Sequence, residues 1–154
     1  MSDDWKLPWE GGCLCGSIRF QVSAAPTLTL ACHCAWCQKR SGSAFSSILC
    51  VPGRGFTLLS GEPEAGWSHS GNPHFFCPQC RNWLFLRIPG PDIVNLRASM
   101  LDDRRWFAPY VEIFAGHKLP WVSTGAPHSF PGMPQEHEFE TLAQSFGREG
   151  PRPG

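Results

Sequence analysis

The sequence predicts a mainly β fold made of small antiparallel sheets. Short segments of alternating apolar and polar residues recur along the 154 residues, with Gly and Pro turn signals between them. Hydrophobic residues make up 42% of the chain, which is enough for one domain with a buried core. Seven of the eight cysteines fall into three tight clusters, so we expect bound metal to staple the sheets together.

The expected strands are short and follow one another without an internal repeat. Alternation is clear over 17–22, which predicts a half-buried strand. Residues 83–88 are strongly apolar, as is typical of a central strand. One helical turn is expected over 37–41. The remaining expected strands are 27–34, 44–51, 56–59, 65–70, 74–76, 93–98 and 110–114.

The composition changes after Trp121. Frequent Pro and Gly residues predict an irregular tail over 122–154, following a domain over 9–121. Within this tail, residues 136–146 have the spacing of one short amphipathic helix. Its apolar face would consist of Phe139, Leu142, Ala143 and Phe146.

The segment 27–34 carries an apolar row into the cysteines. If the strand continues to its end, the even-numbered residues from Leu28 to Cys34 share one face, because side chains repeat every two residues. His33 then points to the opposite face. It is therefore a poor ligand for an ion held by Cys32 and Cys34, and a supporting or solvated role is favoured.

Two cysteine pairs predict a structural zinc site. Cys13 and Cys15 lie near the start of the chain, and Cys77 and Cys80 form a second pair far along it. Together they give four thiolates, the ligand count of a closed tetrahedral zinc site. Such an ion would pin the start of the chain to its middle.

The third cluster predicts a catalytic zinc. Cys32, Cys34 and Cys37 supply three thiolates without an obvious fourth ligand. Three protein ligands and one open position are the pattern of catalytic zinc sites. Lys39 and Arg40 follow directly, either as a solvated basic pair or as anchors for substrate carboxylates.

Other interpretations of the cysteines and histidines stay open. A disulfide framework suits small secreted chains, but the residues before Trp9 contain no apolar signal segment. Both clusters could be purely structural zinc sites, with His33 or a distant residue as the missing ligand. Cys50 is expected to be a buried free thiol in a strand. His69 and His74 are expected at the surface.

Charge and hydropathy exclude some partners. Thirteen basic residues balance thirteen acidic ones, which argues against a general nucleic-acid or anionic-membrane partner. No apolar run approaches the ~20 residues that span a bilayer. Because the cysteines are expected to be reduced, the cytoplasm is the expected compartment.

Three motifs resemble a known family. They are Gly11–Gly12–Cys13–Leu14–Cys15–Gly16, the run from Cys32 to Phe45 and Phe76–Cys77–Pro78–Gln79–Cys80. Over about Trp9 to Trp121 the chain is similar to the glutathione-dependent formaldehyde-activating enzymes, also called the centromere-protein-V-like family. The resemblance implies an Mss4-like fold of small coiled β-sheets. It also implies a structural zinc on the four paired cysteines and a second zinc on the other three.

Two residues depart from the family pattern. Arg81 stands where the family often has glycine, and Glu112 stands where a histidine often precedes isoleucine. Neither change touches the expected zinc ligands, but both bear on the choice of substrate.

The resemblance implies a zinc-dependent carbon–sulfur lyase or synthase. Its namesake reaction joins glutathione and formaldehyde into S-(hydroxymethyl)glutathione, and Lys39 and Arg40 would hold the glutathione carboxylates. His33 and Glu112 are weak candidates for an acid or a base. The alternative is a non-catalytic zinc-stabilised binding module. The sequence leaves the thiol, the aldehyde and the oligomeric state open.

Overall fold

The computed structural model describes residues 3–154, and these form a mainly β fold with eleven strands and two α-helices. Met1 and Ser2, at the start of the segment before Trp9, lie outside the described residues. The helices are α1 (Ala35–Ser41) and α2 (Glu136–Glu149). The strands are β1 (Trp9–Gly12), β2 (Arg19–Val22), β3 (Leu28–Cys32), β4 (Ser46–Pro52), β5 (Phe56–Ser60), β6 (Glu64–Gly66), β7 (His74–Phe76), β8 (Trp83–Ile88), β9 (Ile93–Arg97), β10 (Val111–Ile113) and β11 (His128–Ser129).

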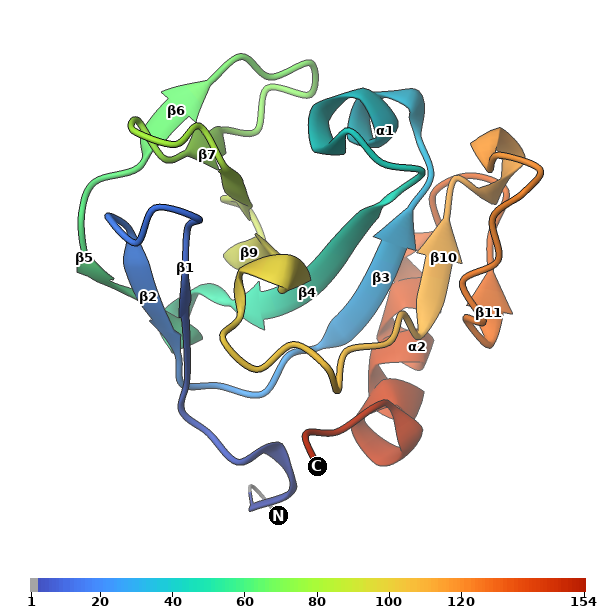
Figure 1. Cartoon of the computed structure of the whole chain (residues 1–154). Helices are drawn as coiled ribbons and strands as arrows, with labels where there is room; N and C mark the ends of the chain where they lie inside the picture. The colour runs from blue at the N-terminus through green and yellow to red at the C-terminus, as the bar shows by residue number, and fades with distance from the viewer. Residues whose placement is uncertain (1–2) are drawn as a thin grey trace.

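The strands form two sheets (Figure 1). The smaller sheet has the order β1-β2-β5, and the larger one has the order β11-β10-β3-β4-β9-β8-β7-β6. Most neighbours pair antiparallel, as expected, but β10 runs parallel to both β3 and β11. Parallel neighbours need a long connection, which residues 114–127 provide between β10 and β11.

The smaller sheet packs on one face of the larger sheet. Phe20 and Val22 from β2 share a core with Leu49 and Val51 from β4 and with Leu96 from β9. All five side chains are fully buried. Burial of this apolar area is the main term that holds the two sheets together.

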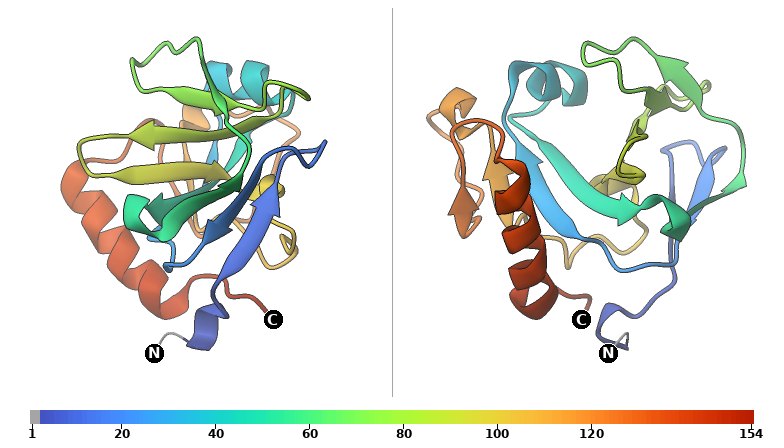
Figure 2. Two further views of the ribbon diagram at one scale, coloured as in Figure 1. Left: turned by 90° about the vertical axis from the view of Figure 1, so that its left-hand side faces the viewer. Right: turned by 180° about the vertical axis from the view of Figure 1, so that it is seen from behind.

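The helix α2 packs on the opposite face of the larger sheet (Figure 2). Its Leu142 and Phe146 are buried in one core with Leu28 and Leu30 from β3. The helix expected over 136–146 is confirmed and continues to Glu149. Because α2 covers only part of this face, the end of β3 that carries Cys32 is left beside the helix rather than beneath it.

Apart from the short strand β11 and the helix α2, residues 122–154 form no regular secondary structure. A capping box starts the helix, in which the Gln135 amide donates to the Glu138 carboxylate at 2.7 Å. The segment around Trp5 lies beside the C-terminal residues (Figure 1), and the guanidinium carbon of Arg152 is 3.8 Å from the centre of the Trp5 ring. The tail shares a buried core with the earlier strands through α2. The division of the chain at residue 121 stays a prediction.

Most expected strands are confirmed. The strands over 74–76 and 83–88 have the expected bounds, whereas the strand expected over 65–70 is shortened to β6. The sequence did not indicate β1 because two of its four residues are glycines. A Cβ atom on Gly11 would lie 2.3 Å from the Met100 carbonyl oxygen, so only glycine allows this close approach of two backbones.

Neither helix within residues 3–154 has the length and apolar character needed to cross a bilayer.

Candidate functional site

Two loops bring the four paired cysteines together. Cys13 and Cys15 follow β1, and Cys77 and Cys80 follow β7. All four sulfur atoms lie within 4.8 Å of one another. The Sγ atoms of Cys13 and Cys15 are 3.6 Å apart, and those of Cys15 and Cys77 are 3.7 Å apart. A tetrahedron with Zn–S bonds of about 2.3 Å has edges of about 3.8 Å, so this cluster fits zinc.

Backbone and hydroxyl groups surround these sulfurs. The amide of Ile18 donates to the Cys13 sulfur at 3.3 Å, and the amide of Cys80 donates to the Cys77 sulfur at 3.4 Å. Burial opposes ionisation of Cys77, but hydrogen bonds from Ser17 and from backbone amides lower its pKa to about 6. The cluster therefore favours the thiolate form that zinc requires.

The other three cysteines meet where β3 passes into α1. Cys32 ends the strand, and Cys34 caps the helix, with its sulfur accepting the Cys37 amide at 3.3 Å. The strand stops at Cys32, so Cys34 reaches the cluster from the helix cap rather than from the expected strand row. The three sulfurs lie within 4.8 Å of one another. No fourth His, Cys, Asp or Glu joins this group among residues 3–154.

Hydrogen bonds among the thiols of this second cluster favour ionisation of Cys34 and oppose ionisation of Cys32. Hydrogen bonding to Cys32, and then to Cys37, lowers the pKa of Cys34 to about 2. The pKa of Cys32 is raised, chiefly by its hydrogen bond to Cys34. Three thiolates can therefore coexist here only with a cation, which is the condition that a bound zinc ion meets.

A polar hollow of about 440 Å³ is lined by Cys80 of the four-cysteine cluster and by Ser46, which pairs with Cys32 across β3 and β4. Arg97 and Trp83 line it, with the guanidinium carbon of Arg97 4.0 Å from the centre of the Trp83 ring. Arg40 also lines it and lies 5.5 Å from the same ring. Arg97 is 5% exposed, and burial lowers its pKa to about 10, so it stays charged at neutral pH.

Several buried polar atoms in this hollow have no hydrogen-bond partner among the described residues. They are Arg97 Nε, Trp83 Nε1 and Ser46 Oγ. Neither Arg97 nor Arg40 forms an ion pair with a carboxylate anywhere in residues 3–154. Because an unpaired buried charge is costly, these groups fit an anionic ligand that reaches the hollow. We call the space lined by Arg40, Ser46, Trp83 and Arg97 the cationic hollow.

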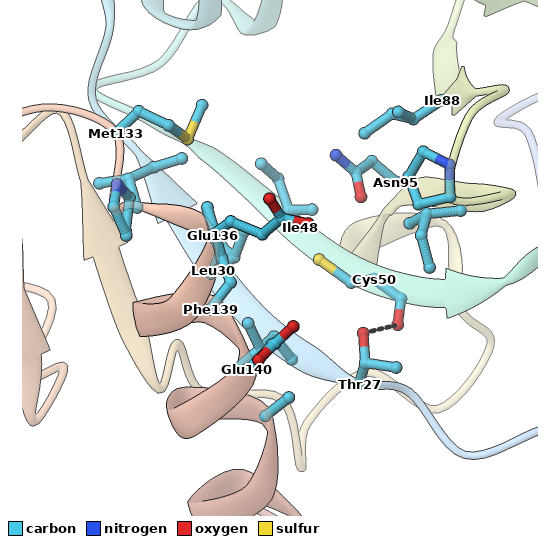
Figure 3. A pocket seen from close by; sticks show the side chains of 16 residues that line it. Thr27, Leu30, Ile48, Cys50, Ile88, Asn95, Met133, Glu136, Phe139 and Glu140 are labelled. Carbon is cyan, nitrogen blue, oxygen red and sulfur yellow. Dashed lines mark hydrogen bonds between the residues drawn. The ribbon is translucent and has the colours of Figure 1, made fainter.

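A second hollow, of about 600 Å³, lies between α2 and the face of the larger sheet on which α2 packs. Figure 3 shows Met133 and Phe139 on the α2 side, with Ile88 and Asn95 across from them. Leu30 and Cys50 lie on its floor. Cys50 is a buried free thiol, as expected, and burial raises its pKa to about 12. We call this space the apolar hollow.

The structure places the two basic candidates, Arg40 and Lys39, in different environments. Arg40 lines the cationic hollow, and its Nη2 donates to the Trp67 carbonyl at 2.9 Å. Lys39 is exposed and is not among the residues that line this hollow.

The two histidines lie in different environments. His69 is exposed, as expected, but the expectation that His74 lies at the surface is wrong. His74 is 4% exposed, because β7 lies between β6 and β8 and directs the ring toward Trp83.

Sequence reasoning missed Arg97. The available signal was its place in the expected strand 93–98. There Ile93, Asn95 and Arg97 alternate with the buried Val94 and Leu96. The alternation places Arg97 on one strand face with Ile93 and Asn95, but the sequence does not tell which residues of other strands lie against that face.

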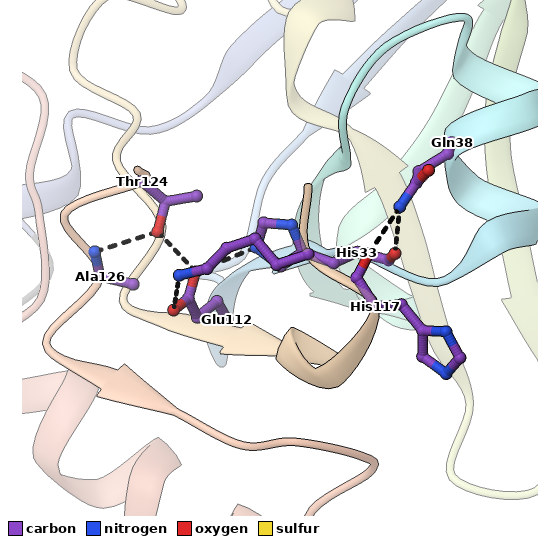
Figure 4. Close-up of polar contacts among 7 residues, drawn as sticks. His33, Gln38, Glu112, His117, Thr124 and Ala126 are labelled. Carbon is purple, nitrogen blue, oxygen red and sulfur yellow. Dashed lines mark hydrogen bonds and ion pairs between the residues drawn. The ribbon is translucent and has the colours of Figure 1, made fainter. Parts of the chain in front are cut away.

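His33 points away from the three cysteines, as expected, and it is buried rather than solvated. Its Nε2 lies 2.9 Å from the Glu112 carboxylate. Lys118 and Thr124 donate to the same carboxylate, each at 3.0 Å. Figure 4 shows Thr124 and His33 beside Glu112. Glu112 pairs with Ala31 across the strands, so both acid–base candidates lie on the sheet face opposite Cys32. They support the sheet and do not reach the cysteine cluster.

The comparison with known families bears directly on these clusters. The model of the family "Glutathione-dependent formaldehyde-activating enzyme" matches residues 8–117, more than half of the chain. The chain belongs to the glutathione-dependent formaldehyde-activating enzyme family. The matched region contains both cysteine clusters, Arg40 and Arg97.

A solved structure is similar to this member of the family in fold. It is a crystal structure of a Rhodobacter sphaeroides protein, with a TM-score of 0.50 and 16% sequence identity. The match covers 61% of this chain and 88% of that one. At this identity the likeness shows the fold alone.

The backbone at Arg81, one of the two departures from the family pattern, explains why glycine suits this position. Its φ is 63°, in the left-handed region that glycine adopts easily and that costs other residues about 1 kcal/mol. Its amide donates to the Cys77 carbonyl at 2.9 Å, which closes the metal loop. Its side chain lies 3.5 Å from Glu64 at the surface.

Glu112, the other departure, uses its carboxylate to bind His33, Lys118 and Thr124. Burial opposes its ionisation, but hydrogen bonds from Lys118, Ser129, His33 and Thr124 lower its pKa to about 2. The carboxylate therefore ties β3, β10 and the tail together on the face away from the cysteines.

Proposed function

We propose that this family member is a zinc-dependent carbon–sulfur lyase or synthase that joins a small thiol, such as glutathione, to an aldehyde. This resembles the formation of S-(hydroxymethyl)glutathione. One observation carries the proposal: a three-thiol cluster lies beside a buried arginine that has no acidic partner among the described residues.

The reaction joins sulfur to carbon without any change of oxidation state. Cys32, Cys34 and Cys37 would hold a zinc ion, which would supply a Lewis-acid position and lower the pKa of a substrate thiol toward neutral pH. The substrate sulfur attacks the aldehyde carbon, the carbonyl π bond breaks, and the oxygen takes up the proton that the thiol lost. The reverse reaction expels the aldehyde from the adduct.

The protein's own contribution is positioning. Arg97 and Arg40 supply charge-assisted hydrogen bonds for the carboxylates of an anionic thiol such as glutathione. Trp83 packs under both guanidinium groups and holds them in place. Lys39, exposed on the outer side of α1, remains a second candidate for this role. Holding the thiol by its carboxylates converts the attack on the aldehyde into a step between oriented groups.

The decisive variant is Cys34→Ser. It removes one ligand of the three-cysteine cluster and leaves the four-cysteine cluster intact. We expect it to abolish formation and breakdown of hydroxymethyl-thiol adducts, to lower zinc content from two ions per chain to one, and to leave the unfolding temperature nearly unchanged. Full activity in Cys34→Ser would contradict the proposal.

Charge reversal separates the two basic candidates. Arg40→Glu and Lys39→Glu change the net charge equally, but only Arg40 lines the cationic hollow. We expect Arg40→Glu to raise the apparent KM for glutathione more than it lowers kcat, and to do so more strongly than Lys39→Glu. A larger effect at Lys39 would assign the carboxylates to the outer side of α1.

The alternative is a zinc-stabilised binding module without catalysis. It would take over if the zinc-loaded protein bound none of the small thiols in isothermal titration and accelerated none of the adduct reactions. Both clusters need reduced thiols, so we place the protein in the cytoplasm as part of this proposal.

A further inference from the structure

The apolar hollow lies on the same sheet face as the three-cysteine cluster. Cys32 pairs with Ile113 across β3 and β10, and Ile113 lines the hollow. Leu30 also lines the hollow and precedes Cys32 by two residues, so their side chains share one face. Neighbouring strands lie about 4.8 Å apart. None of the three cysteines lines the hollow, but two of its lining residues adjoin Cys32: Leu30 lies two residues before it and Ile113 lies opposite it on β10.

Polarity separates the two hollows. Arg40, Arg81 and Arg97 line the cationic hollow, whereas no Lys, Arg or His lines the apolar one among the described residues. Two exposed carboxylates, Glu136 and Glu140, stand at the edge of the apolar hollow. They would repel the carboxylates of an anionic thiol. A thiol of that kind is thus directed to one side of the cysteine cluster, which leaves the other side for a neutral, apolar group.

The volume also bears on the substrate. Pockets of about 300–1,000 Å³ hold drug-sized ligands, and this one measures about 600 Å³. Formaldehyde has no substituent on its carbonyl carbon and would leave nearly all of that space unused. Cys50, whose thiol lies on the floor, stays protonated near neutral pH because burial raises its pKa to about 12. It therefore does not compete with the substrate thiol for an aldehyde.

We propose that the apolar hollow holds the alkyl or aryl substituent of the aldehyde, so that the substrates are apolar aldehydes larger than formaldehyde. This rests on the proposed function, because the cysteine cluster fixes where the carbonyl carbon lies. The thiol occupies the cationic hollow, the carbonyl lies at the cluster, and the substituent extends between Leu30 and α2.

The first experiment needs no thiol. Binding of 1-butanol, 1-hexanol and 1-octanol, neutral analogues of the aldehydes, is measured by isothermal titration on the zinc-loaded protein. Each buried methylene contributes about 0.8 kcal/mol, so affinity is expected to rise about three- to four-fold per methylene. A flat series overturns the inference.

Two variants of α2 locate the binding. Ala143→Phe places a ring in the hollow, whereas Gln144→Phe places the same ring on the exposed side of the helix. Ala143→Phe is expected to weaken 1-octanol binding about ten-fold or more, and Gln144→Phe to leave it unchanged. Equal effects of the two variants, or no effect of either, overturn the inference. Far-UV circular dichroism and melting temperature check that both variants are folded.

A second series links the two hollows. S-methyl-, S-butyl- and S-hexylglutathione mimic the adducts, and affinity is expected to rise with chain length and to fall in Ala143→Phe for the longer chains. If S-methylglutathione binds and the longer chains gain nothing, the inference fails while the proposed function stands. If the alcohols bind but no glutathione derivative does, the hollow is a true apolar site and the glutathione assignment fails.

Discussion

The guanidinium carbon of Arg97 lies 4.0 Å from the centre of the Trp83 ring, and both groups keep a buried nitrogen without a hydrogen-bond partner among the described residues. The ring fixes the arginine by a cation–π contact, and the free nitrogens point to a polar ligand. This pair supports the proposal that the cationic hollow binds an anionic group, and the nearby thiols of Cys37 and Cys32 also attract the charge of Arg97.

Arg97→Met is expected to weaken glutathione binding about ten-fold or more, because a charge-assisted hydrogen bond contributes about 1.5–3 kcal/mol. Methionine keeps the apolar stem over Trp83, and Arg97→Lys should restore part of the affinity. Isothermal titration and zinc analysis check this together. If Arg97→Met instead loses the second zinc and keeps its affinity per bound zinc, Arg97 serves only to balance the thiolates.

Cys77→Ser is expected to remove the structural zinc. Structural zinc sites contribute folding free energy directly, and the four-cysteine cluster joins two distant loops. A loss of several kcal/mol lowers the melting temperature by about 10 °C or more in a chain of this size. Calorimetry and metal analysis measure the effect. A soluble Cys77→Ser protein with unchanged stability and full zinc would contradict the structural role.

The two zinc ions are expected to leave separately during stepwise chelation. The four-cysteine cluster is complete, whereas the three-cysteine cluster depends on an outside group for its fourth ligand. Zinc released at increasing chelator strength is followed with a colorimetric dye. Loss of both ions at a single chelator strength would show that the clusters do not differ in class. Added glutathione should delay the first step.

Glu112→Gln is expected to destabilise the fold by roughly 3 kcal/mol near pH 7, because it leaves Lys118 and His33 without their charged partner. The pKa of Glu112 falls from its ordinary 4.5 to about 2 in the folded protein. Its contribution is therefore fully present above about pH 4.5 and is lost as the pH falls toward 2.

Urea unfolding between pH 3 and pH 7 checks this sign, with the exposed Glu62→Gln as the matched control. The stability difference between the parent and Glu112→Gln should shrink below about pH 4.5. Zinc content is measured at each pH, and the two proteins are compared only where both keep the same zinc content. A difference that grows toward low pH would contradict the pKa assignment.

Phe146→Ala is expected to cost about 3–5 kcal/mol, the usual range for deleting a buried aromatic side chain. Phe146 is fully buried and lies against Trp5 and Tyr110, with ring centres 5.7 and 5.5 Å away. Gln144→Ala, on the exposed side of the same helix, is the control. A stability near that of the parent would instead show that residues 9–121 fold without the tail.

The sequence by itself determined the features that depend on local spacing. The strand over 83–88 follows from its continuous apolar run, and the helix from Glu136 follows from its apolar spacing. Both cysteine clusters come together as expected. Local spacing explains the group Cys32, Cys34 and Cys37, whereas the meeting of Cys13 and Cys15 with Cys77 and Cys80 also depends on the fold. The side-chain period of two in a strand also placed His33 on the face opposite Cys32.

Only the tertiary structure decided what faces these elements. Arg97 meets Trp83, and Glu112 meets His33, because the order of eight strands brings together residues far apart in the chain. Periodicity assigns a side chain to a face of its own strand, but it carries no information about which strand comes next to it. For the same reason the two hollows, which we propose hold the anionic and the apolar parts of the substrate, appear only after the sheet and α2 are assembled.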